Sequence, residues 1–155
     1  MRHPDEIATP RGPARVAVDL PASAPVSLLV LGHGAGGDVD APDLVALRDA
    51  ALDVGVGVAR VTQPYRVAGR RAPAPANHLD EAWSAVVAAL LGRFDTAPPL
   101  VVGGRSSGAR VACRTARSVG AVGVVALAFP LHPPGRPDRS RAAELATGLP
   151  TLLVN

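Results

Sequence analysis

The amino-acid sequence predicts a single domain of the α/β class, with a mostly parallel sheet and helices on both of its faces. The chain has 155 residues, which is enough for one domain with a sizeable core. Hydrophobic residues make up 48% and charged residues 19%, so the composition is that of a folded chain. Short apolar runs alternate with segments of helical periodicity, and this alternation is typical of parallel α/β sheets.

The predicted strands are short apolar runs that end in turn residues. Four of them lack polar alternation, as expected of parallel strands covered on both faces: 27–31, 56–61, 100–102 and 121–127. Residues 15–20 alternate instead, which predicts a half-exposed first strand. A last run occupies Thr151–Val154.

The segments between the strands predict helices at about 40–55, 77–92, 107–120 and 138–148. Asp40 is expected to cap the first helix, and Asn77 with Asp80 resembles a capping box for the second. We expect residues 1–14 to be disordered or loosely attached, and 1–155 to form one incomplete domain.

Residue usage excludes several kinds of site. All 16 basic residues are Arg, and without Lys there can be no Walker-type phosphate loop, Schiff-base lysine or Ser-Lys dyad. The single cysteine, Cys113, excludes an intrachain disulfide and Cys-x-x-Cys metal sites. We expect no metal and no cofactor. With a net charge of +3 and only 3% aromatic residues for base stacking, we expect no nucleic-acid partner.

The chain shows no targeting or membrane signal. Residues 1–10 contain no apolar core of a signal peptide, and the longest apolar stretch, 119–131, is too short to span a bilayer. We therefore expect a cytoplasmic protein that does not associate with membranes.

The strongest chemical motif is Gly104-Arg105-Ser106-Ser107-Gly108, which matches G-x-S-x-G. A predicted strand precedes it and a predicted helix follows, so Ser106 is expected on a tight turn with its hydroxyl exposed as a nucleophile. The glycines leave room for the backbone in such a turn. The alternative is that Ser106 is an ordinary helix N-cap.

A glycine-rich loop, Gly32–Gly37, follows the second predicted strand. In a serine hydrolase this loop supplies one backbone N–H to the oxyanion hole, and the residue after the nucleophile supplies the other. The same glycines fit G-x-G-x-x-G, so a dinucleotide-binding domain is an alternative. Asp38 and Asp40 would repel a pyrophosphate, and no acidic residue ends the next strand, so the sequence favours the hydrolase.

Four motifs occur in the order 31–38, 63–66, 103–108 and 129–135. Together they resemble a family of small bacterial α/β-hydrolases related to dienelactone hydrolases, which includes the hydrolase-like domain of a subunit of the animal non-specific-lethal chromatin complex. The resemblance covers about residues 16–155. It implies an α/β-hydrolase fold, Ser106 as nucleophile, and oxyanion-binding amides at Gly34, Ala35 and Ser107.

The surroundings of Ser106 suggest further site residues. Five side chains are candidate contacts for a small-molecule ester or acyl substrate: His33, Tyr65, Arg66, Arg105 and His132. His33 could instead orient the glycine loop. The cluster of Arg66, Arg70 and Arg71 is either a solvated loop or a site for a carboxylate. On the helix after Ser106, Cys113 is expected to be buried and three arginines to face water: Arg110, Arg114 and Arg117.

The C-terminal part departs from the resemblance. In this fold the acid follows the strand predicted at Thr151–Val154, and the catalytic histidine comes later, but no histidine follows His132. We therefore expect a truncated fold without its last strand and helix, and a hydrolase crippled by an incomplete triad. A Ser106-His132-Asp138 set is conceivable, although its order is wrong for the fold.

Two further expectations follow from the missing part. A non-catalytic interaction module on the same fold is an alternative to the enzyme. The apolar run Thr151–Val154 would form an exposed edge strand, which predicts self-association of the chain.

Overall fold

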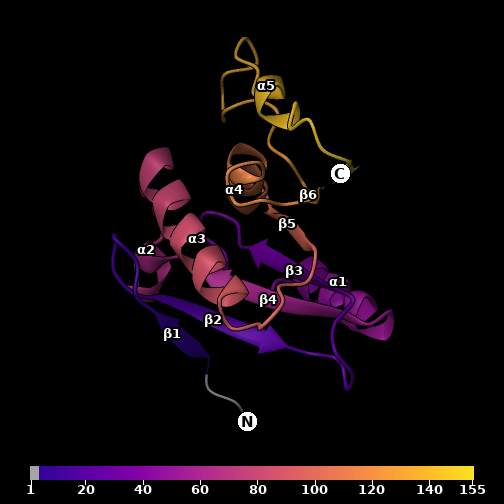
Figure 1. The fold of residues 1–155 in the computed structure, drawn as a ribbon. Coiled ribbons are helices and arrows are strands. Elements are labelled where there is room, and N and C mark those ends of the chain that lie inside the picture. The colour runs from indigo at the N-terminus through magenta and orange to yellow at the C-terminus, as the bar shows by residue number, and fades with distance from the viewer. Residues whose placement is uncertain (1–3) are drawn as a thin grey trace.

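The computed structural model describes residues 4–155, which form one sheet of seven strands with helices on both faces (Figure 1). The strands are β1 (Asp5–Ile7), β2 (Ala14–Asp19), β3 (Ser27–Gly32), β4 (Val56–Thr62), β5 (Leu100–Arg105), β6 (Gly123–Leu127) and β7 (Thr151–Val154). Their order in the sheet is β1-β2-β4-β3-β5-β6-β7. The five strands β4, β3, β5, β6 and β7 pair in parallel. The other two pairings, of β1 with β2 and of β2 with β4, are antiparallel. The predicted fold class is confirmed.

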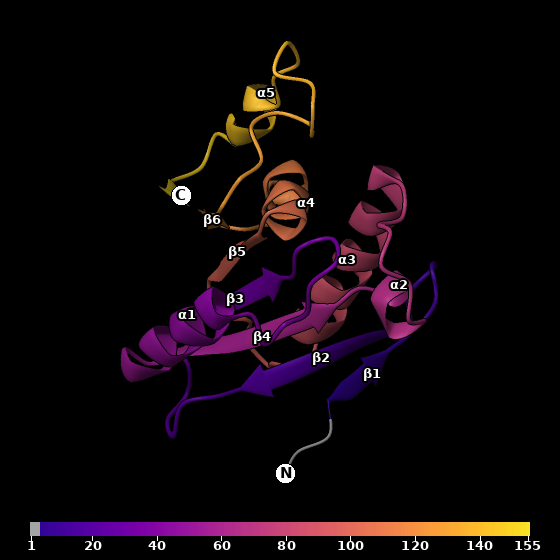
Figure 2. The same ribbon diagram turned by 180° about the vertical axis from the view of Figure 1, so that it is seen from behind.

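The helices are α1 (Pro42–Asp53), α2 (Pro64–Val67), α3 (Ala76–Leu91), α4 (Ser107–Thr115) and α5 (Ala142–Leu145). Two opposite views show α1 on one face of the sheet and α3 with α4 on the other (Figures 1 and 2). The segment with α5 lies beyond α4, near the edge of the sheet that β7 forms. The helix α2 was not predicted, because a single turn is too short to show helical periodicity.

Each face of the sheet has its own core. Alternate residues of β3 point to opposite faces, so that Leu29 and Leu31 pack in the cluster with Leu44 of α1, while Val30 packs with Trp83 of α3. All five side chains are buried. The strand therefore needs apolar residues at every position, which explains its unbroken apolar run.

The N-terminal segment differs from the expected disorder of residues 1–14. Asp5–Ile7 form β1, which pairs with β2, and the side chain of Ile7 is buried in the core. Arg93 donates a hydrogen bond of 2.8 Å to Asp5. The buried side chains of Ile7 and Ala14, together with the strand pairing, hold this segment on the sheet. Residues 1–3, part of the same expectation, lie outside the described residues.

Both expected helix caps are wrong. The N-cap positions of α1 and α3 are Ala41 and Pro75, and neither makes a side-chain capping bond. Asp40 accepts a hydrogen bond of 2.8 Å from Arg60, and Asp80 accepts one of 2.8 Å from Arg114. Guanidinium groups bind carboxylates more strongly than a neutral backbone N–H does, and these partners are far away in the sequence.

Two of the three arginines expected to face water are partly buried in ion pairs. Arg110 pairs with Glu144 of α5 at 2.7 Å, and Arg114 pairs with Asp80 of α3 at 2.8 Å and with Glu144 at 3.4 Å. These contacts join α3, α4 and α5. Cys113 is buried as expected, and burial raises the pKa of its thiol to about 11.

No helix within residues 4–155 is both long enough and apolar enough to cross a bilayer.

Three glycines let α4 sit directly against the ends of β3 and β5. A Cβ at Gly108 would lie 2.5 Å from the carbonyl of Gly32, and a Cβ at Gly104 would lie 2.7 Å from the backbone of Gly108 and from the carbonyl oxygen of Gly32. Real Cβ atoms do not approach backbone so closely. The first turn of α4 therefore contacts the sheet without side chains in between.

We predict that Gly108→Ala destabilises the fold by about 2 kcal/mol or more, because the added methyl group collides with backbone that cannot move aside. Urea unfolding followed by circular dichroism measures the change. Gly36→Ala is the matched control, since a Cβ there would meet nothing within 4 Å. Equal stability of the two variants would contradict the prediction.

Candidate active site

The backbone reverses sharply at Ser106. Between the end of β5 and the start of α4 this residue has φ 53° and ψ −112°. A side chain in the left-handed region costs roughly 1–3 kcal/mol unless glycine stands there, and this conformation is typical of a nucleophilic serine on a strand-to-helix turn. The Ser106 N–H donates to the carbonyl of Leu127 at 2.9 Å, which fastens the turn to the end of β6.

The glycine loop lies beside this turn. A Cβ built on Gly34 would be 3.7 Å from the Cβ of Ser106. The structure therefore brings together the two motifs that the sequence analysis singled out. Within residues 4–155, the N–H groups of Gly34, Ala35 and Ser107 and the hydroxyl of Ser106 make no hydrogen bonds. These donors are free for a ligand.

Three carbonyls of the glycine loop, in contrast, are held by donors. The carbonyl of Gly34 accepts from His33 Nδ1 at 2.7 Å and from the N–H of Gly37 at 3.1 Å. Those of Ala35 and Gly37 accept from the Tyr65 hydroxyl at 2.6 Å and from Arg66 Nε at 2.9 Å. A peptide group is planar and trans, so its C=O and its N–H point in opposite directions. A carbonyl held by a donor therefore also fixes the direction of the N–H of the following residue.

His33 is part of this support. Its side chain is buried, and its Nε2 accepts a hydrogen bond of 3.0 Å from the N–H of Gln63. The proton of the neutral ring therefore lies on Nδ1, which donates to Gly34. Burial lowers the pKa of His33 below its ordinary value of 6.5. With both nitrogens bonded to backbone, the ring is not available as a base for Ser106.

The five candidate substrate contacts fall into two groups. His33, Tyr65 and Arg66 are bonded to the glycine loop, and the first two are buried. Arg105 and His132 are exposed. Arg105 Nε donates to Asp43 at 2.9 Å, and His132 Nδ1 lies 2.6 Å from the carbonyl oxygen of Arg139. The motifs predict which residues stand near the rim but not where each side chain points.

The structure does not assemble a Ser106-His132-Asp138 set. Asp138 pairs with Arg136 at 3.3 Å, and the ring of His132 bonds to backbone. Within residues 4–155 no hydrogen bond joins the three residues of the set.

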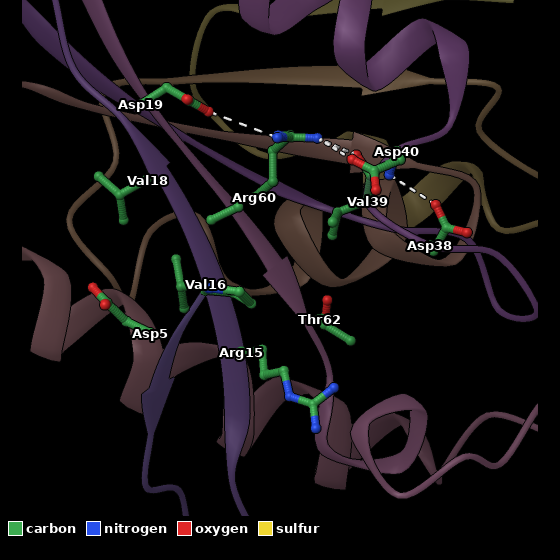
Figure 3. Close-up of a pocket in the computed structure, with 12 residues that line it drawn as sticks. Asp5, Arg15, Val16, Val18, Asp19, Asp38, Val39, Asp40, Arg60 and Thr62 are labelled. Atoms are coloured by element: carbon green, nitrogen blue, oxygen red, sulfur yellow. Dashed lines mark hydrogen bonds and ion pairs between the residues drawn. The ribbon is translucent and has the colours of Figure 1, made fainter. Parts of the chain in front are cut away.

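A surface depression of about 850 Å³ lies elsewhere (Figure 3). Residues of β2, β4 and the 38–40 segment line it, and none of them is Ser, His or Cys. Its notable residue is the buried Arg60, which donates to the carbonyl of Val39 and to Asp40, at 2.8 Å each. Arg60 is not among the site residues predicted from the sequence, although a single charge within an apolar run was a signal.

A sequence profile of the alpha/beta hydrolase domain matches residues 25–155. The chain belongs to the α/β-hydrolase domain family. No curated protein sequence matches the chain.

Solved structures share this α/β-hydrolase fold. One is a serine hydrolase without a lid from Xanthomonas campestris, with TM-score 0.72, 23% identity, and coverage of 83% of this chain and 62% of that protein. A serine hydrolase homologue from Coxiella burnetii has TM-score 0.79 and 17% identity, with 97% and 72% covered. An esterase from Pyrobaculum calidifontis has TM-score 0.66 and 23% identity, with 84% and 45% covered. The chain thus spans less than two thirds of the first and third of these proteins.

We predict that His33 makes the stability of this α/β-hydrolase domain depend on pH. Because the pKa of His33 is lowered in the folded state, the unfolded chain binds its proton more readily, so this contribution is present above about pH 6.5 and is lost as the pH falls below it. Melting temperatures between about pH 7.5 and pH 5.5 should fall less steeply for His33→Gln than for wild type.

The control for this prediction is His78→Gln, because the side chain of His78 on α3 makes no hydrogen bond within residues 4–155. This variant should keep the wild-type slope. If His33→Gln and wild type lose stability in parallel over the same pH range, His33 is not the group responsible.

Proposed function

We propose that this chain carries the nucleophile of a serine hydrolase of the dienelactone-hydrolase-like type, acting on an ester or acyl bond of a small molecule. The observation that supports this most directly is the strained turn that holds Ser106 next to the glycine loop, with unbonded N–H groups on both segments. The fold shared with a serine hydrolase supports the same chemistry.

In the proposed reaction, Ser106 Oγ attacks the carbonyl carbon of the substrate and forms a new C–O bond. The carbonyl oxygen gains negative charge and accepts hydrogen bonds from the N–H groups of Gly34 or Ala35 and of Ser107. The positive end of α4 favours the same charge. The proton of Ser106 Oγ passes to water and from water to the leaving group, whose bond to carbon breaks when the intermediate collapses. Water then hydrolyses the acyl-serine.

We also propose that the 155-residue chain is slow by itself. The attack needs a base, and no histidine or carboxylate within residues 4–155 forms a hydrogen bond with the Ser106 hydroxyl. Loss of the histidine of such a triad lowers turnover by about a millionfold. Oxyanion donors and substrate binding alone keep about 10³–10⁴-fold acceleration over water, and this residual rate is what the chain should show.

The geometry favours hydrolysis over dinucleotide binding. A pyrophosphate would sit on the N-terminus of the helix that follows the glycines. Here α1 begins at Pro42, and Asp38 and Asp40 stand between it and the loop. The carboxylates of this segment would repel phosphate.

We predict that a fluorophosphonate probe labels wild-type chain slowly at Ser106 and that p-nitrophenyl acetate acylates the same residue. Ser106→Ala should remove both modifications, as peptide mass spectrometry can show. Ser118→Ala, which loses a hydroxyl bonded to Thr115 at the far end of α4, is the control and should react like wild type. Labelling that persists in Ser106→Ala would refute the assignment of the nucleophile.

We further propose that the chain self-associates through β7. This strand is at the edge of the sheet in residues 4–155, and 59% of Leu152, 45% of Leu153 and 46% of Val154 are exposed. Unpaired edges with apolar side chains recruit other strands.

We predict that light scattering after size-exclusion chromatography finds oligomers of the wild-type chain. Leu152→Lys should shift them to monomers, because a charge on an edge strand opposes pairing. A monomeric wild-type chain would end this proposal.

A further inference from the structure

We propose that the segment Arg60–Arg66 is a clamp that positions the oxyanion-binding loop, with Tyr65 and Arg66 as positioning residues that touch no substrate. This inference rests on the proposed function for its catalytic consequence. The clamp itself rests only on the hydrogen bonds between this segment, at the end of β4, and residues 33–40.

The clamp reaches the loop at four points along its length. From the N-terminal side, Gln63 holds the His33 ring that bonds to Gly34, and Tyr65 holds Ala35. Arg66 donates to the carbonyl of Gly37. Arg60 donates to the carbonyl of Val39, and Figure 3 shows these last two residues. In each of these contacts a backbone carbonyl of the loop is the acceptor. The donors are Arg60, Tyr65 and Arg66 of the segment itself and the ring of His33, which is bonded to Gln63.

The carbonyl contacts decide where the N–H groups point. The peptide between Gly34 and Ala35 carries the Gly34 carbonyl on one edge and the Ala35 N–H on the other. His33 and the Gly37 N–H bind the first edge, so the Ala35 N–H faces the opposite way and stays unbonded. A loop rich in glycine has many other conformations available to it, and without the clamp the Ala35 N–H would not stay in one direction.

Tyr65 is the central part of the clamp. Its ring is 6% exposed and meets the ring of His33 edge to face, with centroids 5.9 Å apart. Its hydroxyl donates to Ala35 at 2.6 Å. Burial also raises the pKa of Tyr65, so the hydroxyl keeps its proton and stays a donor. The residue therefore supports the loop both by a hydrogen bond and by fixing the orientation of His33.

The orientation of the N–H groups affects the rate, because an oxyanion hole stabilises the transition state only when its N–H groups already face the developing charge. Removing one such donor lowers turnover by about 10²–10³-fold. A donor that is present but poorly oriented costs less. We therefore expect Tyr65→Phe to slow acylation of Ser106 by about tenfold, with little change in the ester concentration that half-saturates the reaction.

The test combines two measurements on the full chain, for Tyr65→Phe and for Arg66→Met. NMR hydrogen exchange follows the amides of Gly37 and Gln63, both of which donate within the clamp. Their exchange should rise about fivefold, as expected from the loss of one hydrogen bond. The rate of Ser106 acylation by p-nitrophenyl acetate should fall in the same variants.

Thr115→Val is the matched control. It removes a buried hydroxyl that donates to a backbone carbonyl at 2.8 Å, as Tyr65→Phe does, but within α4. It should leave both measurements unchanged. Arg66→Met keeps the test decisive if Tyr65→Phe fails to fold, because Arg66 is only partly buried.

The outcomes separate the clamp from the proposed function. Unchanged exchange in the folded variants overturns the clamp, whether or not Ser106 reacts. Raised exchange with unchanged acylation overturns the positioning role. If exchange rises but wild-type Ser106 never reacts, the clamp is supported and the proposed hydrolase fails.

Discussion

The direct contact of backbone with backbone at Gly32, Gly104 and Gly108 is the constraint on which the rest of the site depends. Because no side chain separates α4 from the ends of β3 and β5, the helix begins immediately above the sheet. The chain then has only Ser106 in which to turn from strand to helix, and that residue takes the left-handed conformation. The same contact brings the end of β3, where the glycine loop begins, to the side of the serine.

A strained residue persists only where its surroundings leave no alternative. At Ser106 the N–H is bonded to Leu127, the following helix is packed on glycine, and the preceding strand is paired on both sides. Ala128, directly after β6, also has a positive φ, and its N–H is bonded to Val154. Such positions cost roughly 1–3 kcal/mol each, a sizeable part of the stability of a small domain, and the two stand directly after neighbouring parallel strands, at the carboxyl ends of β5 and β6.

Sequence alone predicted the features that depend on local patterns. The parallel strands followed from apolar runs, and the turn at Ser106 followed from glycine spacing between a strand and a helix. What failed depended on partners distant in the sequence. Asp40 and Asp80 looked like caps because their pairing with Arg60 and Arg114 is created by the fold. Tyr65 and Arg66 were predicted as substrate contacts, and a motif does not reveal that their donors point at loop carbonyls.

Arg60 is a charged residue at a buried position of β4, and its contacts with the segment after the glycine loop explain why it is there. Its neighbours in β4, Ala59 and Val61, are fully buried aliphatic residues. A buried ion pair is often no more stable than a well-packed apolar side chain, and here Nε has no partner within residues 4–155. Packing alone therefore does not explain an arginine at this position. An aliphatic residue would, however, leave the Val39 carbonyl without its donor, at the point where the glycine loop passes into α1. A guanidinium can reach that carbonyl and the Asp40 carboxylate together, so the charge is best explained as the anchor of the loop rather than as a source of stability.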